Sequence, residues 1–299
     1  MHKTYTIVFF FSVALTSMAV LAFVVFGLNL GVDFKGGSFL ELEFKNGKPH
    51  MEEIKKALND NIPGIKDINF VEEAEGNLIM KTSQLSEQDH QAIVDILKSK
   101  FSSNELVEKR FDSVGPVVGQ ELKQKSMTAI IIVLIAVIIY IAFVFRKMSV
   151  VLSPWAMSVA AIMALFHDVI IPVGVFAVLG HYYNVEISAV FVAAILTILG
   201  YSVSDTVVVF DRVRENVIRN RVKDDFGKLV HLSIMQTLTR SLNTTFTTLL
   251  SLIAIYAFGG ESLRYFALAL IIGILSGAYS SIFVASPILV WWSKRFKSR

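Results

Sequence analysis

The sequence contains no cysteine and little charge. None of its 299 residues is cysteine, which excludes disulfides, thiolate metal sites and cysteine nucleophiles. Only 18% of the residues are charged and the net charge is +3, so nothing points to a nucleic-acid partner. Phosphate loops, GxSxG and HExxH motifs and metal-spaced histidines are also missing. We therefore expect neither an enzyme nor a metal site nor a cofactor.

Long apolar runs dominate what is present. Hydrophobic residues make up 54% of the chain, which is high for a soluble domain of this size. Crossing a ~30 Å hydrocarbon layer takes about 20 helical residues. Six runs are long enough, at 5–28, 125–145, 151–179, 187–210, 241–258 and 264–292. No small-residue cleavage site follows the first run, so we expect a retained helix rather than a signal peptide.

The positive charges predict an orientation. Lysine and arginine gather near Lys3, after the second span, in the segment 211–240 and in the tail, whereas the opposite short connections hold only Arg264. Cytoplasmic loops are enriched in these residues. We expect a multi-pass protein of the bacterial inner (cytoplasmic) membrane with both termini cytoplasmic. The segment 211–240 is expected to be a basic cytoplasmic loop, either solvated or lying on the membrane surface.

A separate domain is predicted between the first two spans, on the periplasmic side. Strand patterns at 38–44, 66–72, 77–83 and 104–111 alternate with helical patterns at 50–60 and 86–100. The order β-α-β-β-α-β is typical of a ferredoxin-like α+β sandwich. We therefore divide the chain into a first transmembrane helix at 1–28, this domain at 29–122 and a five-helix membrane bundle at 123–299.

Ionisable side chains inside membrane spans are costly and tend to mark ion pathways. Asp168, Asp205 and Arg240 are the main ones here, and Tyr201 shares a helical face with Asp205. A buried carboxyl favours its neutral form, and an approaching cation favours the carboxylate. We therefore expect these four residues to form a proton relay in which Arg240 moves toward or away from Asp205.

Other interpretations remain open. Serine and threonine stripes also serve as plain packing surfaces, and Arg240 could extend to the membrane surface. Counting from the expected helix ends puts Asp168 in the outer half of the membrane and Asp205 in the inner half, which argues against an aspartyl protease dyad. Gly273 and Gly277 form a small-xxx-small pair that predicts close helix packing.

Several stretches resemble the SecF family of protein-export membrane proteins, within the RND superfamily. They are GVDFKGG at 31–37, FDSVGPVVGQEL at 111–122, LFHDVI at 165–170, GYSVSDTVVVFDRVREN at 200–216 and GAYSSIFVASP at 277–287. The residues carried over from the family are Gly31, Asp33, Gly36 and Gly37 of the periplasmic junction, and Gly200, Ser204, Thr206, Asp211 and Arg212 of the fourth span. Ser204 is a departure, since many relatives carry asparagine there.

The resemblance implies a six-helix RND-type half bundle that pairs pseudo-symmetrically with SecD beside the SecYEG channel. It implies a subunit that uses proton motive force to assist translocation of a preprotein, with protons as the coupling ion and no cofactor. Asp205 matches the proton-carrying aspartate, and Arg240 matches the arginine of the fifth span less securely. With six spans, we expect a separate SecF rather than a fused SecDF. The alternatives are half of a small-molecule RND-type exporter and a purely structural membrane scaffold.

Overall fold

The computed structural model describes residues 3–47, 49–62, 68–72, 77–146, 154–220 and 225–297. The chain divides into two compact units, which we describe separately. One unit joins Met1–Asn29 to Met127–Arg299, and the other is Leu30–Ser126. The first unit is helical and the second contains a small sheet, which confirms the predicted fold class.

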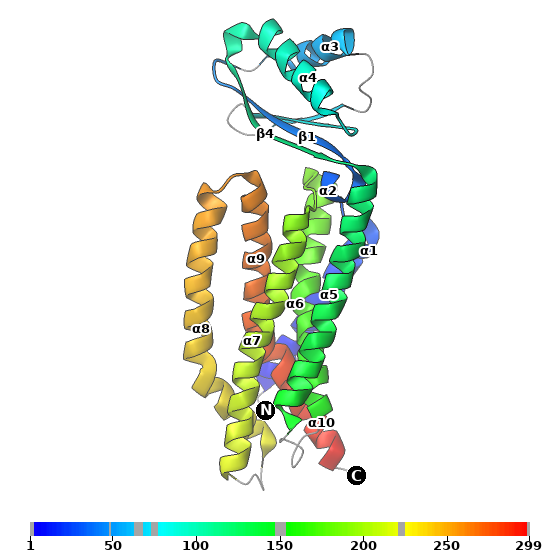
Figure 1. Cartoon of the computed structure of the whole chain (residues 1–299). Coiled ribbons are helices and arrows are strands. Elements are labelled where there is room, and N and C mark those ends of the chain that lie inside the picture. Colours follow the sequence, from blue (N-terminus) through cyan, green and yellow to red (C-terminus); the bar gives the residue numbers. More distant parts are fainter. Residues whose placement is uncertain are drawn as a thin grey trace. The chain divides into compact units, whose positions relative to one another are not determined.

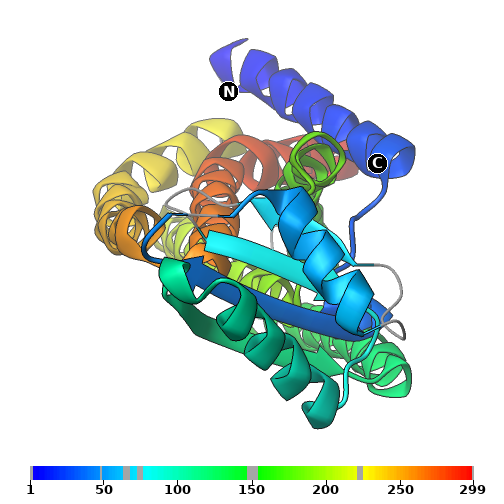
Figure 2. The same cartoon turned by 90° about the horizontal axis from the view of Figure 1, so that it is seen from above.

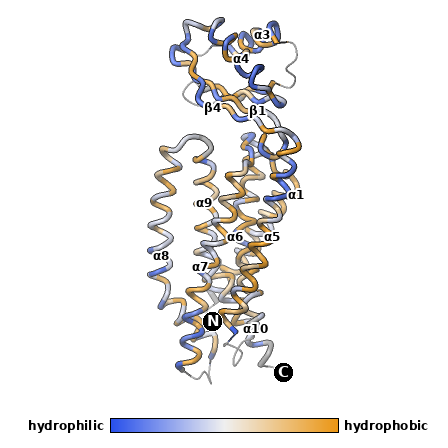
Figure 3. The backbone as a smooth tube through the Cα atoms, viewed as in Figure 1, coloured by the Kyte–Doolittle hydropathy of each residue, from blue (hydrophilic) through white to orange (hydrophobic). Residues whose placement is uncertain are grey.

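Long helices build the first unit (Figure 1). They are α1 (Lys3–Phe26), α5 (Pro116–Val144, which begins in the second unit), α6 (Pro154–Tyr183), α7 (Ala189–Asn220), α8 (Phe226–Phe258), α9 (Glu261–Ser280), a π-helical segment η4 (Ser281–Ala285) and α10 (Ser286–Lys297). Within the described residues, six helices are long and apolar enough to cross a membrane, and the sixth combines α9, η4 and most of α10. Figure 3 shows the apolar residues along these helices.

Two of these helices are longer than the sequence predicted. The segment 211–240 was expected to be a loop, but α7 continues to Asn220 and α8 begins at Phe226, with residues 221–224 outside the described part. Ion pairs one turn apart, Arg212–Glu215 and Arg214–Asp211, stabilise the end of α7 in water. The helices therefore extend beyond their apolar spans, which hydropathy alone cannot reveal.

Small side chains allow the membrane helices to pack closely. α6 buries five alanines completely or almost so, Ala156, Ala160, Ala161, Ala164 and Ala177. A Cβ added at Gly174 of α6 would lie 2.6 Å from the backbone of Ala19 in α1. Lipid supplies no hydrophobic drive for helix association, so this close van der Waals contact must contribute much of the stability.

The second unit has the predicted ferredoxin-like arrangement. Its elements are α2 (Val32–Lys35), β1 (Gly37–Phe44), α3 (Met51–Asn61), β2 (Asn69–Glu72), β3 (Asn77–Thr82), α4 (Glu87–Lys100), the 3₁₀ turn η2 (Ser102–Asn104) and β4 (Leu106–Val114). The antiparallel sheet has the order β2-β3-β1-β4. Helices α3 and α4 lie on one face of it (Figure 2). Part of the predicted strand 66–72 lies outside the described residues.

One side of β1 and the facing sides of the two helices form the core of this unit. Leu40, Leu42, Ile54, Leu58 and Leu97 are fully buried there. Alternate residues of a strand point to opposite faces, which explains why Glu41 and Glu43 lie outside this cluster. The alternation in the sequence was therefore a sound guide to the sheet.

A capping box fixes the start of α4. The Ser86 hydroxyl accepts a hydrogen bond from the Asp89 amide at 3.2 Å, and the Asp89 carboxylate accepts one from the Ser86 amide at 3.3 Å. We expect Ser86→Ala to destabilise α4 by about 1 kcal/mol, because one helix donor loses its partner. Hydrogen exchange of the α4 amides in the full chain measures this. Ser99→Ala, at an exposed site inside the same helix, is the control, and equal protection in the two variants would contradict the prediction.

Candidate functional site

Asp205 lies near the middle of α7, a helix of 32 residues. Its side chain is buried, with 8% of the residue exposed. Two serine hydroxyls donate to it: Ser241 of α8 to one carboxylate oxygen and Ser281 of η4, at 2.6 Å, to the other. Each oxygen of this carboxyl thus has a neutral donor from a neighbouring helix, and among the described residues no ion pair is formed with it.

Asp168 of α6 is a second buried carboxyl, with no exposed surface. The His167 imidazole approaches one oxygen through Nδ1 at 2.8 Å. Ser202 of α7 donates to the other oxygen at 2.5 Å, and Ser280 of α9 donates to the same oxygen at 2.7 Å. The partners of Asp168 therefore lie on α6, α7 and α9, and Ser202 and Ser280 are close in sequence to Asp205 and to its partner Ser281.

The structure corrects the expected depths of the two acids. Asp168 binds Ser202, which lies three residues before Asp205 and thus only about 4.5 Å along the helix axis. The two carboxyls are therefore at neighbouring levels rather than in opposite halves of the membrane. The error arose from the helix ends, since the described part of α6 begins at Pro154 instead of 151 and α7 ends at Asn220 instead of 210.

These carboxyls do not form a protease-like dyad. Paired aspartates in such enzymes share one proton across a short contact. Here the oxygens of Asp168 and Asp205 accept bonds from serine hydroxyls and from the His167 ring. The described residues also contain no group of three or more metal-ligating side chains. Each carboxyl is therefore satisfied by its own set of partners, and the serines among them lie on neighbouring helices.

Arg240 does not face Asp205 in this structure. It is exposed and lines a 500 Å³ pocket at the end of α7 and α8, together with Asp211, Arg212 and Glu215. The next residue, Ser241, is the one that reaches Asp205. Successive helix residues point about 100° apart, which explains the difference. Within the described part of the chain, no ion pair is formed by Arg240.

The remaining residues of the fourth-span motif occupy two sides of α7. Tyr201 and Thr206 turn inward, and their hydroxyl oxygens are buried without a hydrogen-bond partner among the described residues. Gly200 and Ser204 are exposed. Asp211 pairs with Arg214 at 3.2 Å, and Arg212 pairs with Glu215. Both pairs lie on α7 itself and do not involve the buried acids. Only part of the motif is therefore buried inside the bundle.

The four junction residues belong to the second unit, where they shape a sharp turn. Gly31 caps the short helix α2, and Asp33 lies in its first turn. Gly36 and Gly37 have φ of +79° and +132°, which side-chain-bearing residues rarely adopt. A Cβ at Gly36 would lie 2.7 Å from the Cα of Pro116. The motif thus lets the chain pass close to the start of α5.

Sequence reasoning missed the serines that hold the acids. Ser202, Ser241, Ser280 and Ser281 are all almost completely buried, and the sequence had singled out none of them as a partner of the acids. Ser202 could have been found from its position one turn before Asp205. The partners on other helices could not, because one sequence gives no information on which faces meet.

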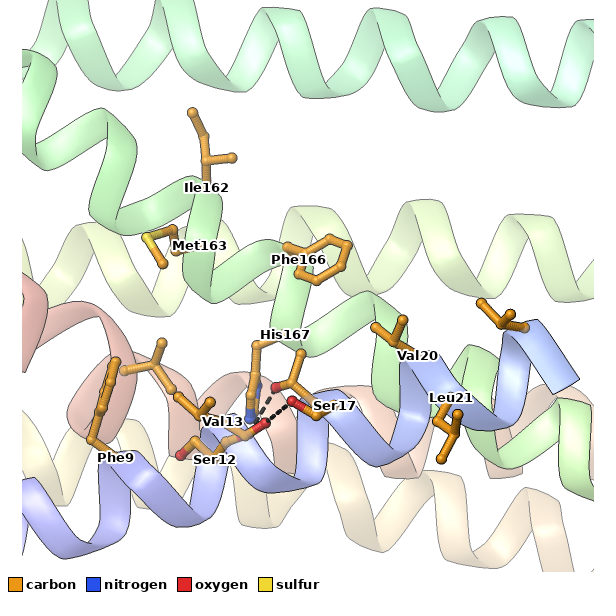
Figure 4. A pocket seen from close by; sticks show the side chains of 13 residues that line it. Phe9, Ser12, Val13, Ser17, Val20, Leu21, Ile162, Met163, Phe166 and His167 are labelled. Atoms are coloured by element: carbon orange, nitrogen blue, oxygen red, sulfur yellow. Dashed lines mark hydrogen bonds between the residues drawn. The ribbon is translucent and has the colours of Figure 1, made fainter.

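A groove of 760 Å³ between α1 and α6 ends near the same site (Figure 4). Apolar side chains dominate its lining, among them Phe9, Val13, Leu21, Ile162, Met163 and Phe166. His167 is the ionisable residue in that lining, and its Nε2 is buried without a hydrogen-bond partner among the described residues. The acid site is therefore bordered by apolar surface on the α1 side.

Two protein-family models match the chain. The model described as "Protein export membrane protein SecD/SecF, C-terminal" matches residues 93–295. The model described as "SecD/SecF GG Motif" matches residues 21–48, which include the junction glycines. Together they match residues in both units, and residues 49–92 lie between the two matched ranges.

Curated relatives and solved structures point to the same family as the two family models. The chain is 43% identical to "Protein translocase subunit SecF" of Thermobaculum terrenum, covering 91% of this chain and 86% of the relative. It is 38% identical to "Protein translocase subunit SecDF" of Brucella abortus, covering 93% of this chain but 35% of that one. The SecDF crystal structure from Thermus thermophilus, "a translocon-associated membrane protein", matches with a TM-score of 0.81 at 32% identity, covering 99% of this chain and 38% of that one. A SecDF structure in "Super-membrane-facing form" gives 0.69 at the same identity and 39% coverage of that chain.

Fold and site together define a multi-pass membrane protein with the RND-type architecture of SecDF. The family matches make the assignment specific. The chain belongs to the SecD/SecF family of protein-export membrane proteins, as the sequence motifs indicated.

Gly273 and Gly277 of α9 lie against α7 beside this site. A Cβ at Gly273 would lie 2.2 Å from Ile198, and one at Gly277 would lie 3.1 Å from Ser202. We expect Gly273→Ala to destabilise the bundle by about 1–3 kcal/mol through overpacking. Gly200→Ala is the matched control, because nothing lies within 4 Å of its Cβ position. Thermal unfolding of both variants in detergent measures the difference, and equal midpoints would contradict the packing argument.

Proposed function

We propose that this chain is the SecF subunit of a Sec accessory complex, in which it pairs with SecD and uses proton motive force to assist preprotein translocation. The observation that carries the proposal is Asp205, a buried mid-span carboxyl held only by serine hydroxyls. The relatives named as SecF translocase subunits favour protein as the transported substrate, rather than a small molecule.

The surroundings of Asp205 suit reversible proton binding. Burying a carboxylate without a cation is costly, whereas a neutral acid can be satisfied by hydroxyl partners. A cation that approaches the group favours proton release. Arg240, the neighbour of Ser241 on α8, is the cation nearest in sequence to this contact. We propose that turning or shifting α8 exchanges a serine for a guanidinium beside Asp205.

Moving a proton across the membrane can bias such an exchange. One elementary charge crossing the field is worth about 2.3 kcal/mol per 100 mV. That energy is comparable to the few kcal/mol that separate two conformations of a bistable protein. We propose that the conformational change is transmitted to the domain at 29–122, which acts on the preprotein in the periplasm beside SecYEG. Protons are the coupling ion, and no cofactor takes part.

The exposed surface of α8 supports pairing with SecD. One side carries polar residues, Arg240, Thr244, Thr247 and Ser251, and Ser204 of α7 is exposed as well. The opposite side carries large apolar residues, Leu242, Phe246 and Ile253. Lipid suits only the apolar side, because exposed polar groups are costly in hydrocarbon. We propose that SecD covers the polar side, consistent with the fused SecDF relatives.

The distribution of basic residues supports the orientation. Arg212, Arg214 and Arg219 lie at the end of α7, and both ends of the described chain lie at that same end of the helical unit (Figure 1). Following the positive-inside rule, we propose that this end is cytoplasmic, in the bacterial inner membrane. Residues 29–122 are then periplasmic.

Replacing Asp205 by asparagine tests the proton role. Asp205→Asn keeps the size of the side chain but cannot exchange a proton, so we expect normal accumulation and SecD association but loss of proton-dependent stimulation of secretion. Secretion into inverted membrane vesicles, with and without a proton gradient, is the measurement. Asp95→Asn, an exposed acid on α4 of the second unit, is the control. Normal stimulation in the Asp205 variant would refute the proton role.

Site-directed crosslinking tests the partner surface. The chain has no cysteine, so single substitutions give clean probes. We expect Thr244→Cys, on the polar side of α8, to crosslink to SecD, and Phe246→Cys, on the apolar side, to be inert because it faces lipid. Crosslinking at both positions alike, or only at Phe246, would contradict the proposed interface.

A further inference from the structure

Two consecutive serines connect the two buried carboxyls. Ser280, the last residue of α9, donates to Asp168 at 2.7 Å, and Ser281, the first residue of η4, donates to Asp205 at 2.6 Å. One peptide bond joins these two residues, so a backbone shift at one of them also moves the other. A change in one of these hydrogen bonds therefore acts on the other.

Each of these serines has a second acceptor within reach. Ser280 Oγ lies 3.2 Å from the Gly277 carbonyl oxygen, and Ser281 Oγ lies 3.1 Å from that of Ala278. A hydroxyl carries one proton, so it donates either to the carboxylate or to the backbone. When the carboxyl is protonated it becomes the donor, and the serine hydroxyl can then turn to the carbonyl. Protonation of the acid thus changes the hydrogen bonding of the helix.

The backbone hydrogen bonds around Ser280 and Ser281 can change when the serine hydroxyls change partners. The Gly277 carbonyl also accepts the amide of Ser281, after which the helix becomes π-helical. In η4 the Ser281 carbonyl accepts the Ser286 hydroxyl at 2.8 Å. Ser280 therefore competes for the same oxygen that positions Ser281, the residue bound to Asp205. π-helical segments often occur at functional sites, since they interrupt regular helix pairing.

His167 gives Asp168 a proton-binding partner. Its Nδ1 faces the carboxyl, and its ring stacks on Tyr279 of α9 with centroids 5.9 Å apart. α7 contributes Ser202 to the pair and carries the titratable side chains of Tyr201 and Asp205, and α1 contributes the Ser12 hydroxyl, which donates to Tyr279 at 2.9 Å. Among the described residues, His167 is the one ion-pair partner found for Asp168. An added proton can therefore reside on the carboxyl or on the imidazole.

From this geometry we infer that His167 and Asp168 form a second proton-binding site, coupled to Asp205 through the Ser280–Ser281 step. A proton taken up by the pair changes the bond donated by Ser280. The altered competition at the Gly277 carbonyl shifts Ser281 and changes the hydrogen bonding of Asp205. The inference deepens the proposed function, but the coupling is a property of the protein that can be measured without secretion.

Infrared titration of the SecD–SecF complex in lipid vesicles tests the coupling. Carboxyl stretching bands of isotope-labelled aspartate are followed against pH, and Asp168→Asn and Asp205→Asn assign the two bands. Coupling between two binding sites is reciprocal, so we expect each variant to shift the midpoint of the other acid. We expect a shift of at least about half a pH unit, roughly threefold in proton affinity. The reciprocal design also keeps the test decisive if one asparagine variant does not fold.

Serine variants test the route. When Ser280→Ala is combined with either asparagine variant, the shift in the midpoint of the other acid is expected to disappear. When Ser276→Ala is used instead, the shift is expected to persist, because the Ser276 hydroxyl donates to the backbone of its own helix. An Asp168 carboxyl that does not titrate, independent midpoints, or coupling that survives in Ser280→Ala would overturn the inference. These outcomes are separate from the secretion result for Asp205→Asn, which tests the proposed function alone.

Discussion

The arrangement of the membrane bundle depends on satisfying two carboxyl groups that are buried among the helices. A buried polar group without a partner costs several kcal/mol, so each oxygen needs a donor from the protein. Asp168 takes its donors from α6, α7 and α9, and Asp205 takes its donors from α8 and η4. These contacts fix the register of the four helices against one another. A slide of α9 and η4 by one turn, about 5.4 Å, would remove one donor from each acid.

The choice of serine for these donors has two consequences. Serine is small, so helices that carry it can approach as closely as the glycine and alanine surfaces around it allow, for example where Gly277 meets Ser202. Serine is also neutral, so it satisfies an acid without fixing its charge. An arginine in the same place would commit the acid to its ionised form. The site is therefore tightly packed, and its serine donors do not fix the charge of either acid.

Much of this architecture could be predicted from the sequence. The six spans follow from run length, and the sheet follows from the alternation in residues such as Leu40, Glu41 and Leu42. The ends of α7 and α8 could not be predicted, because a helix that leaves the membrane becomes polar and resembles a loop by hydropathy. The levels of Asp168 and Asp205 were wrong for the same reason. The directions in which the side chains of Arg240 and Ser241 point depend on the rotation of α8 about its axis, which neighbouring helices determine.

The proposed mechanism depends on the rotation of α8. Arg240 and Ser241 are adjacent on α8, yet only Ser241 contacts Asp205, while Arg240 lies in the pocket with Asp211 and Glu215. Those two acids already pair with Arg214 and Arg212, so Arg240 gives up no ion pair by leaving. Moving it toward Asp205 therefore costs mainly the serine contact and the desolvation of the guanidinium. Loss of the Asp205 proton, which creates a charge for the guanidinium to neutralise, is the event that can offset both costs.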